Sequence, residues 1–244
     1  MLAALMIRLA GTARALTLGF MVFAVLPVAS PASGQTLTWG VGGAGGSGTW
    51  NSGTTANWFN GATIVWPGTG TAATFAGTSG TVTISGSVRA TDLTFLTSGY
   101  TITGGTLALI KTAATPTISL ASGLSGTIGS IVTGTQGFTL SGGGALALGG
   151  ANTFTGTTTI TSSTLTVAAA NGLGATTSSI VNNGVLNLTA GAVTYGGLTG
   201  TMSGSGTANV RTFGGSSSVI LNGNYSGYTG VWNIGGSGST AKCR

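Results

Sequence analysis

The chain has 244 residues, of which 47 are glycine and only 3% are charged: seven lysines or arginines, one acidic residue and no histidine. General acid–base catalysis, catalytic triads and most transition-metal sites need histidines or paired carboxylates, so we expect no enzyme, no catalytic residue, no metal ion and no cofactor. A hydrophobic fraction of 41% with so little charge also argues against an intrinsically disordered chain.

Residues 1–34 have the features of a secretory signal peptide. Arg8 and Arg14 precede an apolar run over 15–29, and small residues follow up to Gly34. Because this run is shorter than the roughly 20 residues that span a bilayer, we predict a cleaved leader rather than an anchor. Behind the leader the basic residues form no patch, so we expect no nucleic-acid partner; they are Arg89, Lys111, Arg211, Lys242 and Arg244.

Residues 35–75 form a region rich in glycine and tryptophan. It contains Trp39, Trp50, Trp58 and Trp66. Large rings can close the open end of a stack of strands, whose bare edges would otherwise aggregate. Exposed ring faces could instead stack on a carbohydrate, and the sequence leaves both interpretations open.

Residues 76–235 show a period of two, in which apolar residues alternate with threonine or serine before Gly, Ser or Asn ends each run. This pattern predicts many short β-strands with one face buried. Clear examples are Val82/Ile84, Leu93/Phe95, Ile118/Leu120, Phe138/Leu140, Leu165/Val167 and Leu186/Leu188.

Two all-β architectures fit such strands: an antiparallel sandwich or barrel, and a parallel β-helix. Short strands, irregular spacing and few Asn-Gly or Asp-Gly hairpin signals favour the β-helix. Stacked coils also provide stability in a chain with one cysteine, which cannot form an internal disulfide.

Internal repetition supports stacked coils. The segment 146–174, LALGGANTFTGTTTITSSTLTVAAANGLG, has a shorter counterpart over 220–234. The longer segment resembles the autotransporter-associated β-strand repeat of type V secretion passengers, and the tryptophan-rich region is similar to the start of those passengers. The motif positions are Leu148, Asn152, Phe154, Gly156, Leu165, Leu173 and Gly174.

The resemblance implies a right-handed parallel β-helix, the N-terminal fragment of a passenger displayed at or released from the surface of a Gram-negative bacterium. It also implies an outer-membrane translocator barrel as a partner, which we do not find in this chain. Residues 236–244 end in AKCR and are interpreted as a truncated or frameshifted tail; the alternative is a short secreted protein with a polar tail. We assign no role to Cys243.

The function expected on this basis is structural display, adhesion or self-association, with other copies, cell surfaces or glycans as partners. The alternative is a secreted binding module for ice or carbohydrate, using the Trp cluster or threonine ladders. The ladders do not recur at one fixed period in the sequence, which argues against a plane that binds ice. They are Thr81/Thr83, Thr101/Thr103, Thr157/Thr159/Thr161 and Thr164/Thr166.

Two structural interactions are also expected. Arg89 and Asp92 are close enough in sequence to form a surface ion pair. Stacked amide ladders at turns are expected from Asn152, Asn182, Asn183 and Asn224.

Overall fold

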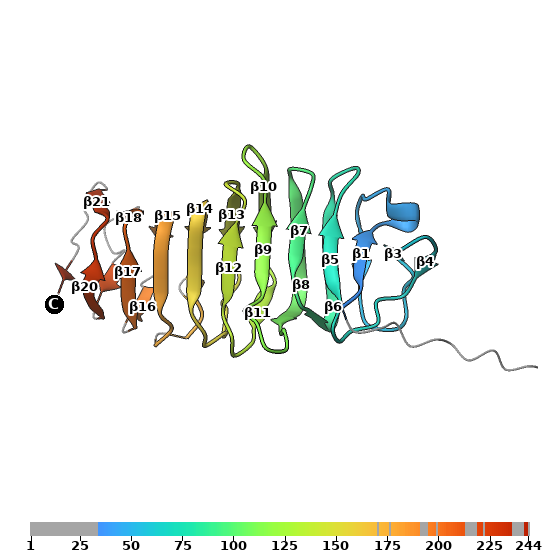
Figure 1. Cartoon of the computed structure of the whole chain (residues 1–244), viewed down its shortest axis with the longest axis horizontal. Coiled ribbons are helices and arrows are strands. Elements are labelled where there is room, and N and C mark those ends of the chain that lie inside the picture. The colour runs from blue at the N-terminus through green and yellow to red at the C-terminus, as the bar shows by residue number, and fades with distance from the viewer. Residues whose placement is uncertain are drawn as a thin grey trace, which may run out of the picture. The chain divides into compact units, whose positions relative to one another are not determined.

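A computed structural model describes residues 34–169, 171–175, 177–190, 195–198, 200–212, 219–221, 223–235 and 242–243 (Figure 1). The chain divides into two compact units, and all described residues belong to the unit Pro31–Arg244. The predicted leader therefore lies outside the described residues apart from Gly34. The predicted tail over 236–244 also lies outside the described residues, apart from Lys242 and Cys243.

The first face of the fold is a stack of strands that pair in parallel from one coil to the next (Figure 1). It consists of β1 (Thr36–Trp39), β5 (Ala72–Phe75), β7 (Leu93–Phe95), β9 (Thr117–Leu120), β12 (Phe138–Ser141), the first halves of β14 (Thr158–Val167) and β15 (Ile180–Ala190), β17 (Thr201–Gly204) and β20 (Asn224–Tyr228).

The second face follows the first in every coil and is also parallel. It consists of β2 (Gly48–Trp50), the first halves of β6 (Thr81–Ala90) and β8 (Tyr100–Leu109), β10 (Ser125–Ile128), β13 (Ala145–Leu148), the second halves of β14 and β15, β18 (Thr207–Thr212) and β21 (Val231–Gly235).

A third face completes the coil. In the earlier coils it is formed by the second halves of β6 and β8 with β11 (Ile131–Thr133). At the corresponding place in the later coils, a separate parallel sheet contains β16 (Tyr195–Leu198), β19 (Val219–Leu221) and β22 (Lys242–Cys243).

Successive coils differ in length but keep their register. Leu93 pairs with Ala73, 20 residues earlier, and with Ile118, 25 residues later. The longer coil carries the extra residues in the loop between β8 and β9, at the edge of the stack. Since the turns absorb the difference, inward and outward positions stay aligned along each face.

A glycine forms the corner where β8 bends from the second face to the third. Gly104 has a φ of 71°, and a Cβ atom there would lie 2.7 Å from the backbone oxygen of Ile84 in the preceding coil. The pairing of β6 with β8 shifts at this point, between Ile84 and Ser87. A larger side chain would push the two coils apart, so the corner depends on the missing side chain.

The core fills the inside of the coils with the apolar residues of the alternating pattern. Each contributes the roughly 1.5–3 kcal/mol typical of a buried large aliphatic or aromatic side chain. All of the pairs named above as clear examples are buried, together with Leu107, Ile128, Val132, Ile160 and Val210.

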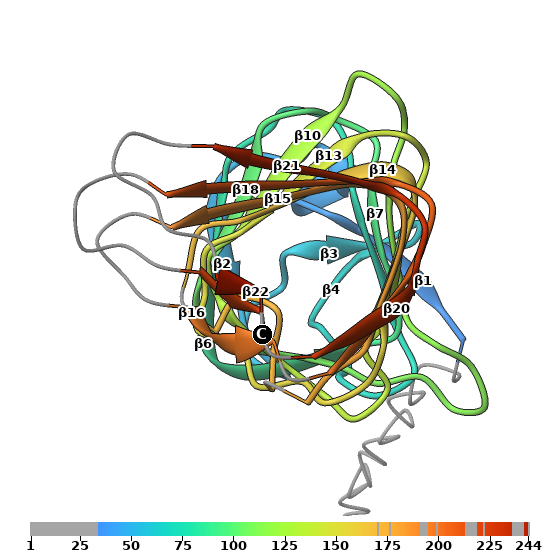
Figure 2. The same ribbon diagram turned by 90° about the vertical axis from the view of Figure 1, so that its left-hand side faces the viewer.

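The N-terminal end of the stack has a different construction. β1 pairs antiparallel with β3 (Trp58–Phe59), which pairs antiparallel with β4 (Thr63–Ile64). A short 3-10 turn, η1 (Val41–Gly43), lies beside them. Viewed along the stack, β3 and β4 fall within the outline of the coils, so this hairpin lies across the end of the core (Figure 2).

Figure 2 also shows the sense of the coil. Seen from the C-terminal end, the chain passes from β20 at the lower right over β21 to β22 at the lower left, counterclockwise as it approaches the viewer. The expected all-β, right-handed parallel β-helix is thereby confirmed. Among the residues that the structure describes, η1 is the one helical segment.

Candidate functional site

The four tryptophans of the N-terminal region form one buried cluster. Trp39, Trp50, Trp58 and Trp66 are each at most 1% exposed. Their ring centroids lie 5.1 Å apart for Trp39 and Trp58, 5.0 Å for Trp50 with Trp58 and with Trp66, and 4.4 Å for Trp58 and Trp66. Phe75 continues the cluster into the next coil, 5.9 Å from Trp58.

The indole nitrogens show how the cluster is held. Trp39 donates to the backbone oxygen of Gly46 at 2.8 Å, and Trp66 donates to that of Arg89 at 2.9 Å. The Nε1 atoms of Trp50 and Trp58 are buried without a protein partner. No ring in the cluster offers an exposed face on which a sugar could stack, so this arrangement gives no support to the carbohydrate alternative.

The residues of the repeat motif lie in two successive coils, between β13 and the segment that follows β14. Leu148, Phe154, Leu165 and Leu173 are buried, and the ring of Phe154 packs edge-on against Phe138 at 5.4 Å. The motif glycines are sites of close approach. At Gly156 a Cβ would meet the backbone of Gln136 and Gly137, and at Gly174, whose φ is 80°, it would meet Phe154.

Asn152 joins three consecutive coils. Its Oδ1 accepts a hydrogen bond from the backbone N–H of Val132 at 2.7 Å, and its Nδ2 donates to the backbone oxygen of Gly172 at 2.7 Å. Asn152 is 2% exposed and lies in the segment between β13 and β14, where no strand pairing is assigned. Its side-chain amide thus adds to the backbone hydrogen bonds that link the coils there, such as those from the N–H of Asn152 to the oxygen of Asn171 and from the N–H of Thr153 to the oxygen of Val132.

The other asparagines named from the sequence have different surroundings. Asn182 is buried and donates to the backbone oxygen of Thr207 at 3.0 Å. Asn183 accepts from the N–H of Ser205 at 3.2 Å. Asn224 is exposed, and its Oδ1 accepts from the backbone N–H and the hydroxyl group of Ser226, two residues further along β20. These side chains do not form one ladder.

A continuous amide ladder does exist on the second face, formed by asparagines other than those expected from the sequence. Asn233 donates to Oδ1 of Asn209 at 2.8 Å, and Asn209 donates to Oδ1 of Asn187 at 2.7 Å. Asn187 donates in turn to the hydroxyl of Thr166 at 3.2 Å. The sequence contains one signal of this ladder: the three asparagines are 22 and 24 residues apart, and each of these spacings is the length of one coil.

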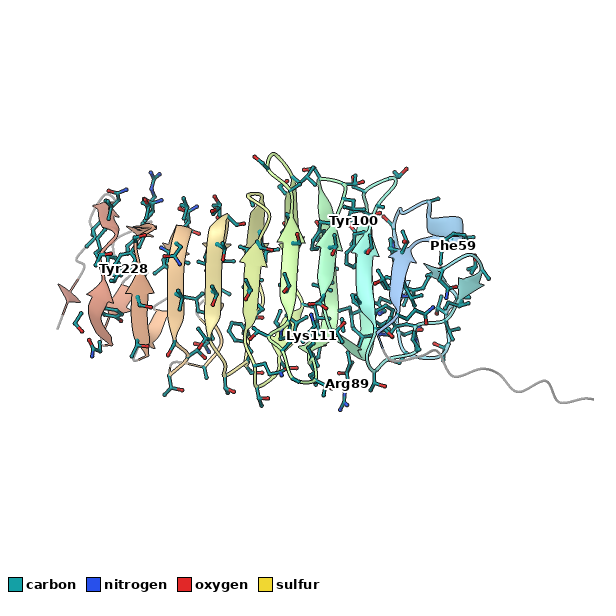
Figure 3. The ribbon with its side chains drawn as sticks, viewed as in Figure 1. Phe59, Arg89, Tyr100, Lys111 and Tyr228 are labelled. Carbon is teal, nitrogen blue, oxygen red and sulfur yellow. The ribbon has the colours of Figure 1, made fainter. Side chains whose placement is uncertain are left out.

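The single acidic side chain pairs with a different partner from the one expected. Asp92 Oδ2 lies 2.9 Å from Lys111 Nζ, and Asp92 Oδ1 also accepts from the backbone N–H of Thr117 at 2.8 Å. The expected pair with Arg89 is wrong, because Arg89 lies near the end of β6 on the third face, whereas Asp92 follows the bend at Thr91 and lies at the start of the first face. Lys111 comes close because it leads into the next coil, and Figure 3 labels it together with Arg89.

The threonine ladders divide between two faces. Thr81 pairs with Thr101, and Thr83 with Thr103, on the second face. Thr159 and Thr161 lie on the first face, whereas Thr164 and Thr166 follow the bend of β14 onto the second. Thr157 is exposed just before β14.

The first face carries two columns of outward hydroxyl residues, which we call the hydroxyl face. The long column runs through Thr38, Thr74, Thr94, Ser119 and Ser141. The short column runs through Thr117, Thr139 and Thr159.

Within the described part of the chain, no group of three or more His, Cys, Asp or Glu residues could hold a metal ion. No helix of these residues is long and apolar enough to cross a membrane.

Comparison with known proteins shows which protein this chain is related to. No family model and no solved structure matches the chain. Over 220 residues it is 37% identical to a protein described as "Adhesin BmaC autotransporter" from Brucella suis biovar 1 (strain 1330), a match that covers 81% of this chain. The chain is a homologue of an autotransporter. The parallel β-solenoid is consistent with an autotransporter passenger, so the resemblance seen in the repeat is confirmed.

The match covers 6% of the length of that relative. The match therefore relates this chain to a small part of that adhesin autotransporter.

Proposed function

We propose that this chain is part of an exported, surface-displayed autotransporter passenger that presents its β-solenoid for adhesion or self-association and performs no catalysis. The observation that carries the proposal is the 37% identity to an adhesin autotransporter over most of the chain. In this proposal the leader over 1–34 directs export from a Gram-negative cytoplasm, and a translocator barrel belongs to the export route.

The construction of the solenoid supports a structural role. Its inside is filled by apolar side chains, and its outside presents threonine, serine and asparagine rather than an acid–base pair. The whole sequence contains no histidine and a single acidic residue, which is too few for general acid–base catalysis by side chains.

The tryptophan cluster is proposed to cap the N-terminal end of the passenger. The hairpin of β3 and β4 lies across the core there, and the four rings fill the space beneath it. Such a cap would protect the first coil from pairing with other chains at an open edge.

The adhesion proposal is tested with beads that carry the purified chain. We expect coated beads to aggregate or to be retained on bacterial or host cell layers, and light scattering to show association that rises with concentration. Beads coated with the same chain after irreversible unfolding are the control. Folded chain that remains monomeric at high concentration and is retained no better than the unfolded control would contradict the proposal.

A further inference from the structure

The hydroxyl face is periodic in two directions. Along each column, residues are one strand apart, about 4.8 Å, and within a strand outward residues such as Thr117 and Ser119 are two positions apart, about 6.6 Å. Both columns keep register even though the coils differ in length, because the turns absorb the difference. The irregular period in the sequence therefore does not prevent a regular array in space.

The hydroxyl groups of this array are available to an outside partner. All members of both columns are partly exposed. None of their side-chain oxygens makes a hydrogen bond to another described residue; at Thr117 only the backbone N–H is engaged. Each hydroxyl can donate one hydrogen bond and accept two, and each threonine adds a methyl group beside it.

The hydroxyl face is also close to electrically neutral. Asp92, immediately before β7, is paired with Lys111 at 2.9 Å. No other charged side chain belongs to the described first-face strands between β1 and β14. The hydroxyl face therefore offers no unpaired charge to a charged partner. A neutral partner made of hydrogen-bonding groups would not be repelled by it.

We propose that the hydroxyl face binds ice. Its two repeats are close to oxygen spacings on the prism plane of hexagonal ice, so water ordered by the hydroxyl and methyl groups can merge with the crystal. The ligand class is crystalline water, held by many weak contacts rather than by one pocket. This inference is independent of the adhesion proposal, since it rests on the first face alone.

The test measures ice shaping, thermal hysteresis and incorporation of the full chain into a slowly growing ice front. The central variant is Thr139→Tyr, in the middle strand of the short column, because a ring that projects from the face blocks contact with a flat crystal. Tyrosine is favoured in strands, which preserves the local structure. Thr159→Tyr is a second variant on the same column, and circular dichroism verifies that each variant is folded.

The matched control is Thr133→Tyr. Thr133 is an outward, partly exposed threonine in β11 on the third face, where its register partner is Ala108. We expect the unmodified chain and the control to shape ice and enter the ice front, and a folded Thr139→Tyr or Thr159→Tyr variant to lose both properties. An unmodified chain without ice activity, or equal losses in the control and the two face variants, would overturn the proposal.

Discussion

Single side chains help to hold neighbouring coils together in the segments between the strands. Asn152 provides one acceptor and one donor to the backbones of the preceding and following coils. Both partners, the N–H of Val132 and the oxygen of Gly172, would lose these bonds without the amide. Its place in the repeat motif thus has a physical reason that does not involve a ligand.

We predict that Asn152→Ala lowers the free energy of unfolding by about 3 kcal/mol, because two buried backbone groups are left without partners. Urea denaturation monitored by circular dichroism measures the change. Asn171→Ala is the control, since Asn171 is exposed in the same motif and its side chain makes no hydrogen bond to the described chain. An equal, small effect of both substitutions would show that the Asn152 amide is dispensable.

At the scale of strands, the alternating pattern predicted which residues point inward but could not predict which strands become neighbours. Phe138 and Leu140 are buried as expected from their spacing alone. The ladder of Asn187, Asn209 and Asn233 was not foreseen, because coil length varies and a fixed repeat cannot align these positions. The same variation concealed the pairing of Asp92 with Lys111, which depends on the path of the loop after β8.

The N-terminal cap gives a prediction at this scale. Trp58→Ala should increase hydrogen exchange in β1 and β5, because the ring contacts Trp39 and Phe75 beneath the hairpin. Exchange in β14 should not change, since a coil contacts only its neighbours. Hydrogen–deuterium exchange with mass spectrometry resolves the two regions.

Phe138→Ala is the matched control for this experiment. Phe138 is a fully buried ring in β12, packed on Phe154. Its removal should raise exchange around β12 and β14 while β1 stays protected. Uniform loss of protection in both variants would contradict a cap that acts on the end of the stack.

For the whole molecule, the scarcity of charge determines how stability responds to pH. The sequence has no histidine and one acidic side chain, so little titrates near neutrality. Burial raises the pKa of Tyr100 and of Tyr228 above the ordinary value of 10.0, against smaller lowering effects of hydrogen bonds from Gly46 and Asn182 respectively. The folded chain thus holds these two phenolic protons more tightly than the unfolded chain.

A tyrosine whose pKa is raised by folding contributes stability that is complete below pH 10.0 and is lost as the pH rises through its folded pKa. We predict a nearly constant free energy of unfolding between about pH 6 and about pH 9, followed by a fall above pH 10.0. Urea titrations across this range provide the measurement. The double variant Tyr100→Phe/Tyr228→Phe should fall less steeply, and an unchanged slope would assign the alkaline loss to other groups.

The parallel stacking of coils also determines how the fold responds to force. Strands of successive coils are joined side by side, so a pull on an end coil loads the bonds of that coil before those of the next. Each coil, such as the 20 residues from Ala73 to Leu93, would release roughly 70 Å of chain when it peels away. Under tension the molecule would therefore lengthen in steps, one coil at a time. Each step would dissipate mechanical work while the remaining coils stay folded.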